Sequence, residues 1–144
     1  MIQRKQTIFL LLAFVLTMVC LSTKIGEYSA EGMVMGKVYN LWVTDASGNR
    51  HFTTWPLMAI LMVSGIIALL TIFMYQKRLV QSKLCAVCAF LMVAWYIAYV
   101  VLTGEGISLC VSAVLPAICA ILYVIARRAI LADEKLVRSM DRIR

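Results

Sequence analysis

Residues 76–83 are short, basic and polar, and they read Gln76-Lys77-Arg78-Leu79-Val80-Gln81-Ser82-Lys83. Long apolar runs flank this stretch on both sides. We therefore interpret it as the joint between two pairs of membrane-spanning helices. Its three basic residues also indicate an orientation, because Lys and Arg accumulate in the cytoplasmic loops of membrane proteins.

The composition excludes an ordinary soluble domain. Of the 144 residues, 63% are hydrophobic and only 15% are charged, whereas soluble domains are about half apolar and about a quarter charged. A chain this short cannot bury so much apolar surface in one core. The net charge of +7 lies in clusters between apolar runs. That pattern indicates membrane orientation or contact with anionic lipid rather than nucleic acid binding.

Four windows without charged residues predict four spans, at residues 6–23, 55–75, 84–104 and 107–126. A helix crosses the hydrocarbon core in about 20 residues. An outer loop at 24–54 and a tail at 127–144 complete a single membrane domain over residues 1–144. The first window is interpreted as an uncleaved span, because Val19-Cys20 and Tyr28-Ser29-Ala30 make poor cleavage sites for a signal peptide.

The basic residues predict which ends face the cytoplasm. Eleven of the 14 Lys and Arg residues lie in the N-terminus, the joint and the tail, and three lie in the outer loop. The predicted fold class is therefore an all-α integral membrane protein, a four-helix transmembrane bundle with both termini cytoplasmic. We expect it to be a multi-pass membrane protein.

Three local features refine this prediction. The outer loop has β character at 38–44 and 51–55 around a turn-like stretch at 45–49, which predicts a small extracytoplasmic β-hairpin. Pro116 predicts a kink inside the fourth span. The tail predicts an amphipathic helix, with an apolar stripe formed by Ala129, Ala132, Leu136, Met140 and Ile143. This helix either continues the fourth span and rests on the inner membrane surface or docks on a cytoplasmic partner.

The sequence offers little chemistry. The predicted spans contain no Asp, Glu, Lys, Arg or His, which disfavours a small transporter or channel. His51 is the only histidine, and we interpret it as a solvated loop residue. No metal-ligand spacing, phosphate-binding loop or catalytic set is present, so neither a cofactor nor a metal is expected.

Five cysteines leave one alternative open. Cys85 and Cys88 form a CxxC motif, which redox proteins use as a pair of reactive thiols. Because this motif lies at the predicted cytoplasmic end of the third span, we favour packing of two small apolar residues. Cys20 and Cys110 both lie near the predicted outer face, and whether they pair stays open.

The two ends of the chain carry a family resemblance. The opening is Met1-Ile2-Gln3-Arg4-Lys5-Gln6-Thr7-Ile8-Phe9-Leu10-Leu11-Leu12-Ala13, and the closing stretches are Arg127-Arg128-Ala129-Ile130 and Asp133-Glu134-Lys135-Leu136-Val137-Arg138-Ser139-Met140-Asp141-Arg142-Ile143-Arg144. They resemble a family of small four-span bacterial membrane proteins catalogued as domain of unknown function 4293. The resemblance implies a Gram-negative inner-membrane protein with no assigned activity, and it implies that the acidic and basic pattern of the tail is the most recognisable feature.

The favoured function is a non-enzymatic accessory or scaffold subunit that acts through its basic cytoplasmic tail. A membrane thiol redox protein using Cys85 and Cys88 is the alternative, and a small transporter or channel is the third. Expected partners are the lipid bilayer and a protein at the cytoplasmic face, with no nucleic acid. The residues predicted to contact lipid or a partner are Lys77, Arg78, Lys83, Arg127, Arg128, Asp133, Glu134, Arg138, Asp141 and Arg142.

Overall fold

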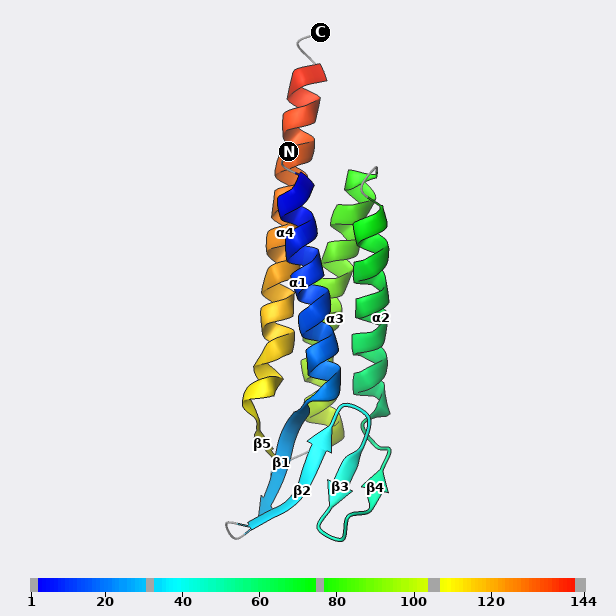
Figure 1. Cartoon of the computed structure of the whole chain (residues 1–144), viewed down its shortest axis with the longest axis vertical. Helices are drawn as coiled ribbons and strands as arrows, with labels where there is room; N and C mark the ends of the chain where they lie inside the picture. The colour runs from blue at the N-terminus through cyan, green and yellow to red at the C-terminus, as the bar shows by residue number, and fades with distance from the viewer. Residues whose placement is uncertain (1–2, 31–32, 75–76, 104–106, 142–144) are drawn as a thin grey trace.

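A computed structural model describes residues 3–30, 33–74, 77–103 and 107–141. Four α-helices run side by side, and a small sheet lies at one end of them (Figure 1). We call this end of the molecule the sheet end. The chain enters α1 and leaves α4 at the opposite end, which we call the terminal end. The elements are α1 (Gln3–Ser22), β1 (Lys24–Ala30), β2 (Met33–Tyr39), β3 (Val43–Asp45), β4 (Arg50–His51), α2 (Trp55–Phe73), α3 (Arg78–Thr103), β5 (Ile107–Leu109), a 3₁₀ helix η1 (Val111–Val114) and α4 (Leu115–Asp141).

The helices form a bundle because each has one buried stripe. On α3 the buried side chains recur every three or four residues, at Cys85, Cys88, Met92, Trp95 and Tyr99, which places them on one helix face. Helix α1 packs against α2 and α4, and α3 packs against the same two helices. The core therefore lies along the bundle axis.

The outer faces of the bundle are apolar rather than charged. Phe73, Phe90 and Val101 are each about three-quarters exposed, at 76%, 75% and 75%. Helices α2 and α3 and the helical stretch Val111–Met140 are long and apolar enough to cross a membrane, while the apolar part of α1, Gln6–Ser22, is shorter. Apolar side chains on the outside as well as the inside are typical of helices surrounded by lipid.

The sheet is larger than the predicted hairpin. It has five antiparallel strands in the order β4-β3-β2-β1-β5. The hairpin prediction was right that β3 and β4 pair around a turn, but wrong in extent, because β2 ends at Tyr39 and β4 covers only Arg50–His51. The main hairpin, β1–β2, escaped prediction because glycines interrupt both strands. They are needed there: a Cβ on Gly36 would lie 2.5 Å from the backbone oxygen of Thr44.

Asn40 joins the sheet to the bundle. It is 1% exposed. Its Nδ2 donates to the carbonyl oxygen of Cys20 at the end of α1, 2.7 Å away. Its Oδ1 accepts from Nε1 of Trp95 on α3 at 3.1 Å, and its backbone oxygen accepts from the N–H of Met58 on α2 at 3.2 Å. One buried residue thus fixes the loop between β2 and β3 to three helices.

The fourth predicted span begins too early. Residues 107–114 form β5 and η1, and α4 starts only at Leu115. The reason is that Ile107, Ser108 and Leu109 pair with β1, a long-range contact that the local apolar pattern does not reveal. Pro116 also does not lie in the middle of the α-helix, where the prediction of a kink placed it. Pro116 is the second residue of α4, where a missing backbone N–H interrupts no helical hydrogen bond.

The joint between the spans is shorter than predicted. Helix α3 starts at Arg78 rather than at residue 84, so residues 78–83 form its first turns. Gln81 and Ser82, read as polar linker residues, are both 4% exposed and face the bundle. At the other end of the chain, α4 runs unbroken to Asp141, so the predicted tail helix continues the helix of the fourth predicted span.

Candidate functional site

A layer of buried polar side chains closes the terminal end of the bundle. Nη1 of Arg78 on α3 lies 3.1 Å from Oδ2 of Asp133 on α4, and the side chains are 21% and 9% exposed. The two atoms form an ion pair but no hydrogen bond. Nε2 of Gln6 on α1 donates to the carbonyl oxygen of Ala129 on α4 at 3.1 Å. Nε2 of Gln81 on α3 donates to the carbonyl oxygen of Thr71 on α2, also at 3.1 Å. We call Gln6, Thr71, Arg78, Gln81 and Asp133 the polar layer.

Beyond the polar layer, α4 continues alone. It extends past the ends of the other three helices (Figure 1). We call its last part, residues 134–141, the α4 projection. Leu136 is 53% exposed and Met140 is 71% exposed. Nε of Arg138 donates to Oε1 of Glu134 at 3.1 Å. The α4 projection therefore presents apolar and charged side chains without cover from the described part of the bundle.

The structure brings together only some of the residues predicted as contacts. Arg78 pairs with Asp133, and Glu134 pairs with Arg138. Four other basic residues that were predicted as contacts are exposed, namely Lys77, Lys83, Arg127 and Arg128. The Asp141 side chain and all of Arg142 lie outside the described residues, as does Ile143 of the predicted apolar stripe. Burial of Asp133 was not predicted, because a carboxylate in a basic tail reads as a surface residue.

The two thiols of the CxxC motif face the interior. Cys85 is 0% exposed and Cys88 is 1% exposed, and Sγ of Cys88 lies 3.7 Å from the carbonyl oxygen of Ser64. Reactive thiols usually lie at accessible, electropositive positions, whereas buried cysteines pack as small apolar residues. All five cysteines are free, Cys20 and Cys110 included.

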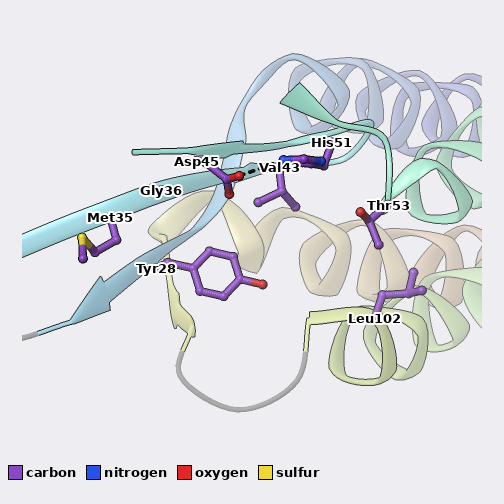
Figure 2. A pocket seen from close by; sticks show the side chains of 8 residues that line it. All are labelled: Tyr28, Met35, Gly36, Val43, Asp45, His51, Thr53 and Leu102. Atoms are coloured by element: carbon purple, nitrogen blue, oxygen red, sulfur yellow. Dashed lines mark hydrogen bonds and ion pairs between the residues drawn. The ribbon is translucent and has the colours of Figure 1, made fainter. Parts of the chain in front are cut away.

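A pocket of about 350 Å³ lies between the sheet and the end of α3 (Figure 2). Its lining is formed by Tyr28, Met35, Gly36, Val43, Asp45, His51, Thr53 and Leu102. Nε2 of His51 lies 2.8 Å from Oδ2 of Asp45, because the β3–β4 turn brings these residues together. Their side chains are 58% and 53% exposed, so this pair lies at the solvated rim. Tyr28 Oη donates to the carbonyl oxygen of Thr103 at 3.4 Å.

The pocket combines one imidazole–carboxylate pair at its rim with apolar lining side chains such as Val43 and Leu102. The prediction of a solvated His51 agrees with its exposure, although the sequence did not reveal its pairing with Asp45. An imidazole held by a carboxylate is one part of a catalytic set. Within the described ranges, no group of three or more His, Cys, Asp or Glu side chains could hold a metal ion.

Comparison with known proteins identifies the family without naming an activity. No curated protein matches the chain. A family model described as "Domain of unknown function (DUF4293)" matches residues 2–143. This match covers nearly the whole sequence, in agreement with the resemblance carried by its two ends. The chain therefore belongs to the DUF4293 family.

Proposed function

We propose that this protein is a multi-pass protein of the bacterial inner membrane with four spans and both termini in the cytoplasm. Helix α1 lies against α2 and α4 along the bundle, so we place it in the membrane beside the three helices that are long and apolar enough to cross it. The basic residues of the joint and the tail gather at the terminal end, where Lys77, Lys83, Arg127 and Arg128 are exposed. This distribution supports a cytoplasmic terminal end.

Within that membrane frame, we propose a non-enzymatic accessory or scaffold role that acts through the α4 projection. The observation that carries this proposal is the unbroken course of α4 from Leu115 to Asp141, which continues beyond the polar layer. A straight continuation of a span leaves the membrane along its own axis instead of lying on the surface. Exposed Leu136, Val137 and Met140 then face the cytoplasm.

The chemistry of the α4 projection indicates the kind of partner. Leu136 and Met140 are spaced four residues apart, on one side of the helix. Lys135 and Arg138 carry positive charge and Glu134 and Asp141 carry negative charge, so the α4 projection has no net formal charge, and Arg138 pairs with Glu134. An amphipathic helix of this type, with charges of both signs beside its apolar side, fits an apolar groove with a polar rim on a cytoplasmic protein. The observations favour this role over thiol redox chemistry, because both CxxC thiols are buried, and over transport, because the described spans lack a buried carboxylate between the membrane boundaries.

Site-specific photocrosslinking in living cells tests this role. A photoreactive amino acid is placed at Leu136, at Met140 and, as a control, at Leu109, which is 61% exposed at the sheet end. The proposal predicts one discrete protein adduct from Leu136 and Met140 that is absent from Leu109 and is lost when Val137→Glu is added. Adducts with lipid alone at positions 136 and 140 would contradict a partner role and support contact with the membrane surface.

A further inference from the structure

The strongest unassigned feature is a groove between α3 and α4 near the terminal end. Its volume is about 240 Å³, and α3 contributes Cys85, Ala86, Ala89, Phe90 and Val93 to its lining. The small side chains of Cys85 and Ala89 lie deepest, since Cys85 is fully buried, while Phe90 and Val93 are 75% and 52% exposed at its edge. From Cys85 to Val93 the groove follows α3 for about 12 Å, at 1.5 Å per residue.

One end of this apolar groove is basic. Arg127 on α4 lines the groove together with Val124. Lys83 precedes Ala86 by three residues and Phe90 by seven, and Arg128 follows Val124 by four, so both lie on the helix faces that border the groove. Arg127 forms no ion pair within the part of the chain that the structure describes. The nearest buried carboxylate along α4 is that of Asp133, which already pairs with Arg78. The positive charge at the groove is therefore available to a ligand.

The position of this charge matches a lipid headgroup. Lys83 is the last charged residue before the apolar part of α3, and Arg127 is the first after the apolar part of α4. Both thus lie where the hydrocarbon core meets the headgroups, provided that α3 and α4 cross the bilayer as proposed above. The apolar groove would then lie within the hydrocarbon core, where it matches an acyl chain. The guanidinium of Arg127 would lie among the headgroups, where it matches a phosphate.

We propose that the groove between α3 and α4 binds one anionic phospholipid, with part of an acyl chain along Phe90 and Val93 and the phosphate on Arg127. The guanidinium can bind phosphate oxygens in a bidentate manner. Lys83 and Arg128 add attraction for a second negative charge on the headgroup. Discrimination against zwitterionic lipid follows from this excess of positive charge.

Native mass spectrometry of the delipidated full-length protein tests this site. The probes are phosphatidylglycerol and phosphatidylcholine with identical acyl chains. The wild type should bind the first phosphatidylglycerol preferentially, and Arg127→Gln should weaken that binding about fivefold. The matched control Lys135→Gln removes the same charge from the α4 projection and should leave the binding unchanged.

Two further variants test the groove separately from the charge. Val93→Phe fills it from an exposed position, and Phe90→Ala removes one of its walls; each should weaken binding of phosphatidylglycerol while Arg127 remains. Glycerol 3-phosphate, the soluble headgroup alone, should not displace the lipid. Equal binding of the two lipids, an equal effect of Lys135→Gln, or displacement by glycerol 3-phosphate would overturn the proposal. Loss of the protein from the membrane fraction of cells would instead contradict the four-span proposal.

Discussion

Arg78 and Asp133 form an ion pair between the first residue of α3 and the last α4 residue whose side chain the structure describes as buried, with Nη1 and Oδ2 3.1 Å apart. The pair lies in the polar layer, where α4 separates from the bundle. It therefore sets the point at which the bundle ends and the α4 projection begins. Asp133 therefore has a structural role that its position in a basic tail does not reveal.

Removing one member of the ion pair should cost more folding free energy than removing the other. Arg78→Gln leaves the Asp133 carboxylate buried without a counter-charge, and breaking a buried pair in this way costs roughly 3 kcal/mol. Asp133→Asn should cost less, because the Arg78 side chain is 21% exposed and can reach water. Unfolding of the purified protein by denaturing detergent measures both. Equal, negligible losses would show that the pair does not stabilise the bundle.

Substitution of Asn40 should lower the stability of the protein more than substitution of any other polar residue at the sheet end. Asn40→Ala leaves the buried N–H of Trp95 without its acceptor, and an unsatisfied buried donor costs about 1–3 kcal/mol. Asn49→Ala in the exposed β3–β4 turn is the matched control and should change stability by less than about 0.5 kcal/mol. Thermal unfolding followed by tryptophan fluorescence compares the two variants. Similar melting temperatures for both would refute the anchoring role of Asn40.

Two glycine substitutions should differ sharply in how much they disturb the structure. A Cβ at position 36 would meet the Thr44 backbone oxygen at 2.5 Å, whereas a Cβ at position 65 would meet the flexible tip of Met18 at 3.1 Å. Gly36→Ala should therefore push β3 away from β2, while Gly65→Ala should leave the bundle intact. Hydrogen exchange of the backbone amides in β2 and β3 measures this. The prediction fails if those amides stay protected in the Gly36→Ala variant.

Glu27 should titrate at an unusually acidic pH. A hydrogen bond and ion pair with Lys24 hold the pKa of Glu27 below its ordinary value. Since the folded-state pKa is depressed, the stabilisation is present above the ordinary carboxyl pKa and is lost as the pH falls through the folded-state value. Lys24→Met should return the Glu27 pKa toward its ordinary value in a carboxyl NMR titration. An unchanged Glu27 pKa in this variant would remove Lys24 as the cause.

The sequence predicts the helices better than their ends. The charge-free window at 55–75 nearly matches α2, and the end predicted at 104 for the third span lies one residue beyond the end of α3. The start of α3 was missed because Gln81 and Ser82 look like linker residues until their burial against the bundle is known. The start of α4 was missed because β5 pairs with β1, about 80 residues earlier.

The candidate sites were predictable to different degrees. Charge clustering identified Lys83, Arg127 and Arg128 as surface residues at one end. The groove beside them could not be predicted, because it depends on which faces of α3 and α4 meet. The pairing of Asp45 with His51 likewise depends on the conformation of a short turn. Spacing along one helix can be read from a sequence, whereas packing between elements cannot.

The central claim is a four-span topology with the sheet outside the cytoplasm, and cysteine labelling tests it most directly. In a Cys110→Ser background, Gln3→Cys, Ser47→Cys and Ser139→Cys are each exposed in intact spheroplasts to a membrane-impermeant maleimide. We predict labelling of the Ser47→Cys variant alone, with the other two labelled only after lysis. Labelling of Gln3→Cys in intact spheroplasts would leave only three spans, and labelling of Ser139→Cys but not Ser47→Cys would invert the protein in the membrane.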